Sequence, residues 1–103
     1  MIYTKDQNYQ GILQLRPNNE KVLNYVYDEI ERSGHVFITK EINKKFGTDL
    51  YLTNKYFIIQ LSKRLKNKFH CKITRSRSLY GKTRHSSKLV YRTTMCFRLT
   101  KDL

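Results

Sequence analysis

The stretch TNKYFIIQLSKRLKNKF, residues 53–69, decides the fold that the sequence predicts. Its apolar residues fall on one arc at 3.6-residue spacing, as on the buried face of an amphipathic helix; they are Phe57, Ile58, Leu61, Leu65 and Phe69. We therefore expect a long helix here, and either Asp49 or Thr53 is its candidate N-cap.

A second amphipathic helix is expected towards the N-terminus. Val22, Val26 and Ile30 repeat every four residues, between a candidate N-cap at Asn18 and a helix-ending glycine at Gly34. This is the first helix of the chain.

Between these helices lies ITKEINKKFG, residues 38–47. The apolar run from Val36 to Ile38 is typical of a short strand. Thr39 is then the expected cap of a short helix over residues 40–46, which Gly47 closes.

Beyond the long helix the apolar period changes from 3.6 to two. Cys71 and Ile73 alternate with polar residues, and residues 89–99 alternate in the same way, so both segments are expected to be strands. We expect Ile73 to lie opposite Met95. The polar, basic residues 76–87 between the strands are expected to form a long hairpin loop.

The N-terminal residues 1–17 give a weaker signal. Gly11, Leu13 and Leu15 alternate with other residues before Pro17, which indicates an arm or an added strand.

The order helix, short strand, helix, helix, hairpin resembles the winged helix-turn-helix family over residues 18–100. The matching pieces are ITKEINKKFG, TNKYFIIQLSKRLKNKF and, as a wing, KITRSRSLYGKTRHSSKLVYRTTMCFRLT at residues 72–100. The resemblance implies an α+β fold: a small winged-helix domain of three helices followed by a two-stranded basic β-hairpin wing, with an optional extra N-terminal strand. Residues 1–17 would be the arm and residues 18–101 the winged-helix domain, a single domain overall. One departure is the linker after Gly47, which is longer than the usual turn if the third helix begins after Thr53.

Charge is distributed unevenly along the chain. Residues 1–49 hold seven basic and seven acidic side chains, whereas residues 50–101 hold fourteen basic side chains and no acidic one. The formal net charge of +13 therefore comes from the second half. Such an excess favours a polyanionic partner, and nucleic acid is the leading candidate.

In the winged-helix family the second helix of the pair enters the major groove and the wing contacts the backbone or minor groove. Carried onto this chain, the candidate nucleic-acid-binding residues of the third helix are Lys55, Tyr56, Ile59, Gln60, Lys63, Lys66 and Asn67. Those of the hairpin are Arg75, Arg77, Lys82, Arg84, Lys88 and Arg92. Gln60 would pair with adenine, Lys63 would approach guanine, and Ile59 would touch a thymine methyl. The competing interpretations are a merely solvated basic helix face and a basic hairpin without defined contacts.

The sequence predicts neither a cofactor nor an enzyme. The histidines and cysteines lack the paired spacing of a zinc site, so no metal is expected; they are His35, His70, His85, Cys71 and Cys96. One catalytic alternative is a metal-independent ribonuclease toxin, for which the candidate residues are His70, His85, Tyr80, Tyr91, Arg84 and Arg92.

The functional expectation is a double-stranded DNA-binding protein, as a small transcriptional regulator or a replication or packaging accessory factor. Alternatives are an RNA-binding protein and an inhibitor that binds an acidic protein partner. A homodimer is an open option, with Leu13, Leu15 and Ile59 as candidate contacts.

The cellular setting is expected to be intracellular. The chain opens without a charged and apolar leader, and its longest apolar run is residues 56–59, so neither secretion nor a membrane partner is indicated. The two cysteines are expected to be reduced. The absence of Ala and Trp beside abundant Lys and Asn favours an AT-rich microbial, viral or phage gene.

Overall fold

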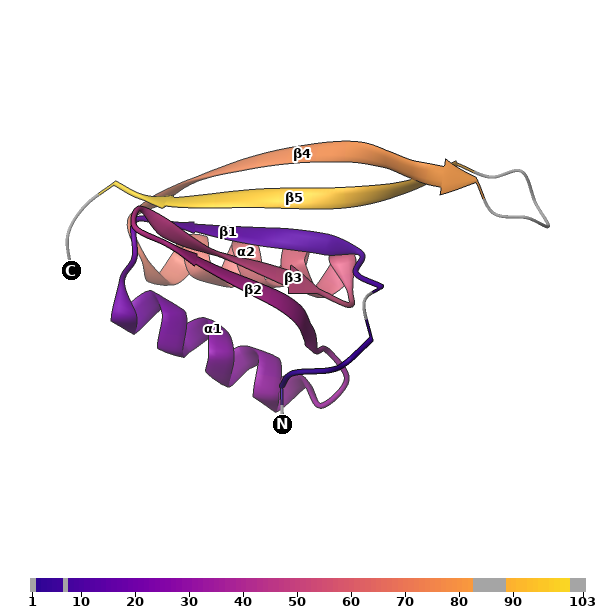
Figure 1. Ribbon diagram of the computed structural model, residues 1–103. Helices are drawn as coiled ribbons and strands as arrows, with labels where there is room; N and C mark the ends of the chain where they lie inside the picture. The colour runs from indigo at the N-terminus through magenta and orange to yellow at the C-terminus, as the bar shows by residue number, and fades with distance from the viewer. Residues whose placement is uncertain (1, 7, 83–88, 101–103) are drawn as a thin grey trace.

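A five-stranded sheet carries two helices on one face (Figure 1). The computed structural model describes residues 2–6, 8–82 and 89–100, and within them the order is β1 (Gly11–Arg16), α1 (Glu20–Ser33), β2 (Ile38–Lys44), β3 (Gly47–Leu52), α2 (Lys55–Lys68), β4 (Cys71–Lys82) and β5 (Leu89–Leu99). The opposite face of the sheet carries no helix of the described chain.

The strands lie in the order β2-β3-β1-β5-β4. β1 and β2 are both antiparallel to β3, so β1, α1 and β2 form a split βαβ unit with β3 inserted between its strands. β5 is parallel to β1 and antiparallel to β4. The sheet is therefore mixed. β5 and β4 form one edge of it, and α2 packs against them.

The first predicted helix is confirmed as α1. Its N-cap is Asn19, one residue later than expected, whose side chain accepts from the backbone N–H groups of Lys21 and Val22. The helix ends at Gly34, where φ is 73°, a left-handed conformation that favours glycine. Val22 and Val26 are buried as the pattern predicts.

The long predicted helix is confirmed as α2, although its start differs from both candidates. Asn54 is the N-cap, and its side-chain oxygen accepts from the N–H groups of Tyr56 and Phe57. Leu61 and Leu65 are fully buried against the sheet, on the predicted arc.

The predicted helix over residues 40–46 is wrong, because this segment is β2, which pairs with β3 as an antiparallel hairpin. Ile38, Ile42 and Phe46 are spaced by four, which imitates a helical stripe, but a segment this short does not decide between the two periods. In the sheet Ile38 is buried, Ile42 is half-buried on the helix-free face, and Phe46 is 60% exposed in the turn.

The winged-helix fold class is therefore wrong. Within the described residues there are two helices rather than three, a mixed five-stranded sheet replaces the wing, and α2 follows a strand instead of the first helix of a helix-turn-helix. Residues 76–82 continue β4 rather than belonging to the predicted loop.

The pairing of the last two strands also differs from the prediction by two residues. Ile73 lies opposite Phe97, and Met95 lies opposite Arg75. A shift of two preserves the faces, since side chains alternate with period two. Cys71 and Cys96 consequently lie on opposite faces of the sheet, and both are free.

The hydrophobic core lies between the helices and the sheet. Leu13 and Leu15 of β1 belong to it, with 0% and 3% exposure, so they are not surface contacts for a dimer. α2 approaches the sheet closely at Gly11: a Cβ there would lie 2.5 Å from Cδ1 of Ile58 and 2.8 Å from the carbonyl oxygen of Thr93. Its missing side chain lets α2 pack over β1 and β5.

Candidate nucleic-acid interface

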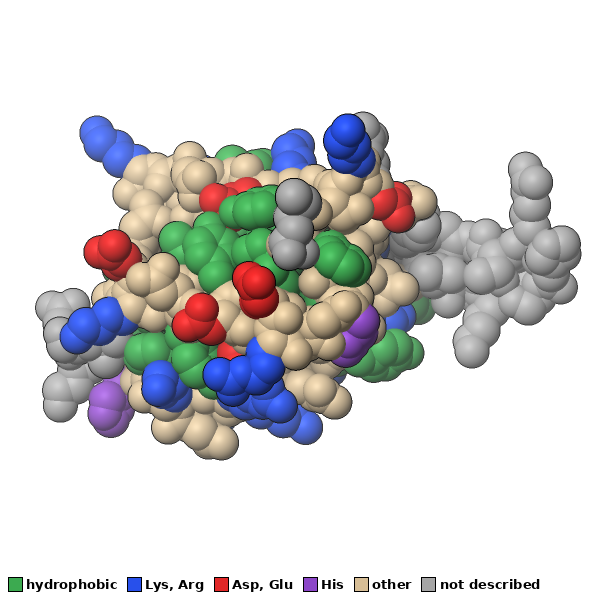
Figure 2. Space-filling model, turned by 90° about the horizontal axis from the view of Figure 1, so that it is seen from below, with side chains coloured by type: hydrophobic (Ala, Val, Ile, Leu, Met, Phe, Trp, Pro, Cys, Tyr) green, Lys and Arg blue, Asp and Glu red, His purple; other side chains and the backbone are tan. Residues whose placement is uncertain are grey.

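The fold converts the charge asymmetry of the sequence into a spatial one. α2 packs against β1, β4 and β5, and none of α2, β4 and β5 contains an acidic residue. The acidic residues of the described chain lie in the N-terminal arm, α1, β2 and β3. Figure 2, which looks at the helix side, shows acidic side chains around an apolar patch, with basic side chains at the borders of this face, most densely along its lower edge.

A groove of about 280 Å³ runs between α2 and β4. Lys63, Lys66 and Arg75, all exposed, supply its charge, and its remaining lining residues are Ile59, Ser62, Ile73 and Met95. We call this feature the α2–β4 groove. It unites four residues predicted from the sequence to bind nucleic acid: Ile59, Lys63, Lys66 and Arg75.

Other predicted residues of α2 do not line this groove. Gln60 lines a hollow between the two helices, where Arg64 donates to Glu29 of α1 at 2.9 Å. Tyr56 is 65% exposed, with Nζ of Lys55 5.5 Å from its ring centroid. Asn67 is exposed near the end of the helix.

The predicted hairpin residues are described in part. The guanidinium of Arg77 lies 5.3 Å from the ring centroid of Tyr91, on the neighbouring strand. Lys82 is the last residue of β4, and Arg84 and Lys88 lie outside the described residues.

Two like charges face each other across the final hairpin. Lys72 lies directly opposite Arg98 on the helix-free face, and both are exposed. Directly opposed like charges destabilise a strand pair. A bound phosphate group would relieve that repulsion.

The structure brings Arg92, a predicted nucleic-acid-binding residue, together with Tyr51 and with two residues that the sequence analysis missed, Lys40 and Tyr9. On the helix-free face, the rings of Tyr9 and Tyr51 meet edge to face with centroids 4.8 Å apart. The guanidinium of Arg92 lies 3.8 Å from the Tyr9 centroid, and Nζ of Lys40 lies 5.6 Å from the Tyr51 centroid. We call Lys40, Tyr51, Tyr9 and Arg92 the tyrosine row. The alternation of Leu50 and Leu52 around Tyr51 was the one local signal for an outward-facing ring.

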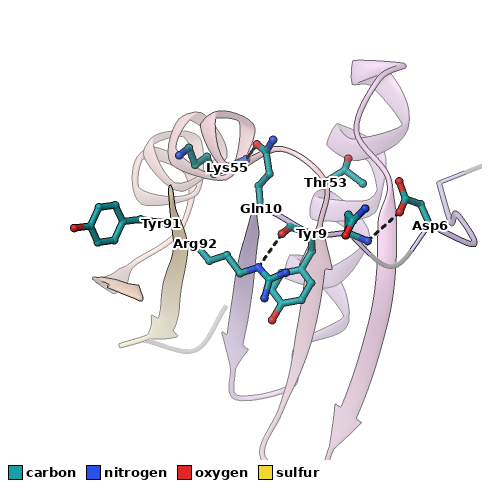
Figure 3. Close-up of a pocket in the computed structure, with 8 residues that line it drawn as sticks. Asp6, Tyr9, Gln10, Thr53, Lys55, Tyr91 and Arg92 are labelled. Atoms are coloured by element: carbon teal, nitrogen blue, oxygen red, sulfur yellow. Dashed lines mark hydrogen bonds between the residues drawn. The ribbon is translucent and has the colours of Figure 1, made fainter. Parts of the chain in front are cut away.

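Two hollows flank Tyr9. One, of about 500 Å³, is lined by Asp6, Asn8, Tyr9, Gln10, Thr53, Lys55, Tyr91 and Arg92 (Figure 3). The other, of about 540 Å³, is lined by Tyr9, Thr39, Lys40 and Tyr51. Arg92 Nε donates to the carbonyl oxygen of Tyr9 at 3.1 Å, while Tyr91 points away from that contact in Figure 3.

One titratable group near the α2–β4 groove, the thiol of Cys71, has a shifted pKa. Burial raises the pKa of the Cys71 thiol, and Lys66 only partly opposes this, so the thiol stays protonated at neutral pH. Within the described ranges, no three His, Cys, Asp or Glu side chains gather as metal ligands. Neither described helix has the length and apolar composition needed to cross a lipid bilayer.

Comparison with known families overturns the winged-helix resemblance. The model of the family described as NMD3, second domain, matches residues 8–99, which include every helix and strand of the fold. No curated protein matches the chain. The match and the β-rich fold also overturn the helix-turn-helix and transcription-regulation interpretations.

Proposed function

The chain belongs to the NMD3 second-domain family, and from this premise we propose that it is an RNA-binding domain. The family assignment supports a role related to nucleic acid or to the ribosome. It offers no support for duplex DNA as the ligand, so RNA replaces the DNA duplex that the sequence analysis favoured.

The observation that carries the proposal is the acid-free surface built by α2, β4 and β5. Sequence alone places the positive charges in one half of the chain, but the strand order places them on one side of the molecule. A region of the surface with many basic and no acidic side chains of its own attracts a polyanion and accelerates its association. Solubility alone is normally served by interspersed charges of both signs.

The α2–β4 groove is where we propose that the RNA backbone lies. Lys63 and Lys66 approach from the helix and Arg75 from the strand, so a phosphate chain in the groove meets cations on both walls. Ile59, Ile73 and Met95 give the groove an apolar lining suited to ribose. Phosphate contacts of this kind position a ligand without reading its bases.

We propose binding rather than catalysis as the activity. Two of the six residues of the ribonuclease alternative, Arg84 and His85, lie outside the described residues. RNA that stays intact during prolonged incubation without added metal would agree with a binding role.

The test is fluorescence anisotropy with a structured RNA and a DNA duplex of equal length, over a series of salt concentrations. Each phosphate contact contributes about 0.7–0.9 to the slope of log K against log salt. The triple variant K63A/K66A/R75A should therefore flatten the slope by about 2–3 and weaken RNA binding.

The matched control is K5A/K21A/K45A, which removes three exposed positive charges from the first half of the chain. It should leave the slope nearly unchanged. Equal effects of the two triple variants would show that net charge alone drives binding, and a preference for the DNA duplex would refute RNA as the ligand.

A further inference from the structure

The tyrosine row crosses the helix-free face near the N-terminal end of β1. Lys40 comes from β2, Tyr51 from β3, Tyr9 from the arm before β1, and Arg92 from β5. Each neighbouring pair is in ring–ring or cation–ring contact, at 5.6, 4.8 and 3.8 Å in that order. The N-terminal arm, the β2–β3 hairpin and β5, three distant parts of the chain, thus form one continuous aromatic and cationic surface.

Hydrogen bonds on both sides hold Tyr9 in this row. The N–H of Gln10 donates to the carbonyl oxygen of Leu52 at 2.9 Å, and the N–H of Thr93 donates to the carbonyl oxygen of Gln10 at 3.2 Å. Arg92 adds its bond to the carbonyl oxygen of Tyr9. The arm is therefore fixed to β3 and β5, and the ring of Tyr9 does not need to be ordered when a ligand binds.

The row is separate from the hydrophobic core. Core side chains of β1, β3 and β5 point to the helices, whereas Tyr9 and Tyr51 are half-buried on the other face. The hollows beside Tyr9 measure about 500 and 540 Å³. Each is within the size range of small-ligand sites, and Tyr9 forms a wall of both.

The chemistry of these hollows matches unpaired nucleotides. Bases stack on tyrosine rings and on arginine guanidinium planes, while nearby cations attract phosphate. Lys40 supplies a cation to one hollow, and Lys55 and Arg92 supply the other with two cations against the single carboxylate of Asp6. Bases inside a duplex are already stacked on one another, so only a single strand can present them to these rings.

We propose that the tyrosine row binds adjacent unpaired bases of single-stranded RNA, one in each hollow beside Tyr9. This inference rests on the proposed RNA-binding function and names the class of RNA bound on this face. The α2–β4 groove lies across the sheet, on the helix side, and takes the backbone.

The experiment compares binding of a ten-nucleotide oligouridylate with binding of a blunt RNA duplex. Tyr51→Leu removes the ring while keeping an apolar side chain. It should weaken oligouridylate binding about 5- to 100-fold, the usual effect of losing one stacking side chain. The salt slope should stay unchanged because no charge is lost, and duplex binding should change less than twofold.

Two further variants separate stacking from folding. Tyr51→Phe retains the ring and should bind oligouridylate as the unmodified protein does. Tyr3→Leu removes a ring that is 49% exposed and bonded to Glu41, away from the row, and should have no effect on binding. Photo-crosslinking with 4-thiouridine should label Tyr9 or Tyr51.

The outcomes distinguish this inference from the proposed function. If the unmodified protein binds the duplex but not oligouridylate, or if Tyr51→Leu binds oligouridylate normally, the tyrosine row is not a base site and the proposed function still stands. If no RNA binds, the proposed function itself fails.

Discussion

Replacing Asp49 by Asn should destabilise the fold more than most single changes. Nη2 of Arg16 donates to Oδ1 of Asp49 at 2.6 Å, and the two side chains are only 10% and 6% exposed. β1 and β3 pair at this point, so the ion pair joins two central strands. Asn preserves the shape of Asp49 but leaves the Arg16 charge buried without its carboxylate.

The magnitude follows from the burial. Breaking a buried pair by removing one partner costs about 3–5 kcal/mol. The lower end applies here, because Arg16 keeps its bonds to the carbonyl oxygens of Leu15 and Thr48 and its contact with the Phe46 ring. A loss of about 3 kcal/mol is a large part of the roughly 5–15 kcal/mol of a typical domain, and corresponds to a fall in Tm of about 12–24 °C.

Urea unfolding followed by circular dichroism measures this change. The m-value should stay constant, since the surface exposed on unfolding is unchanged. Asp6→Asn, at an exposed position, should change the free energy of unfolding by less than about 0.5 kcal/mol. The double variant R16M/D49L should recover most of the loss, because an apolar pair replaces a buried ion pair at little cost. A D49N loss below about 1 kcal/mol, or a double variant no more stable than D49N, would refute the reasoning.

Two further predictions concern α1 and α2. Burial and the Glu41 carboxylate, to which the Tyr27 hydroxyl donates at 2.6 Å, raise the pKa of Tyr27 well above its usual value. As pH rises, the unfolded chain therefore loses the Tyr27 proton before the folded protein does. The stability that Tyr27 contributes is complete below pH ~10 and declines as pH rises above it. Tyr27→Phe should make the fall in urea midpoint between pH 8 and 11 smaller, and an identical fall would contradict the raised pKa of Tyr27. Asn54→Ala removes the N-cap of α2 and should lower the free energy of unfolding, measured by thermal unfolding, by about 1 kcal/mol. Asn24→Ala, on the exposed side of α1, should not lower it. Equal effects of the two variants would argue against Asn54 as a stabilising cap.

The sequence predicted the elements whose signals are local. α1 and α2 were found because their apolar stripes span several turns, and the last two strands because their alternation is sustained. Residues 40–46 were misassigned because Thr39 and Gly47 resemble the residues that begin and end a helix, whereas pairing with β3 decides the conformation of this segment. That single error produced the third helix and the winged-helix resemblance.

In the candidate site, too, the sequence predicted individual residues but not which of them lie together. Lys63 and Lys66 were identified because they lie on the exposed arc of one helix, and Arg75 because it is basic in a basic hairpin. Their union in the α2–β4 groove depends on the packing of α2 beside β4, which no local pattern reports. Tyr9 and Tyr51 were not paired, because they are distant in the chain and meet only where the arm crosses the sheet.

By itself, the sequence determined the two amphipathic helices, the alternating C-terminal strands and the confinement of uncompensated positive charge to the second half of the chain. These properties depend on side chains within a few residues of one another. Only the tertiary structure decided the strand order, the parallel pairing of β1 with β5, the α2–β4 groove and the tyrosine row. The strand order, the β1–β5 pairing and the tyrosine row depend on contacts between segments far apart in sequence, and the groove depends on how α2 packs against the assembled sheet. The free energy of these contacts is gained only when the whole sheet assembles against the helices.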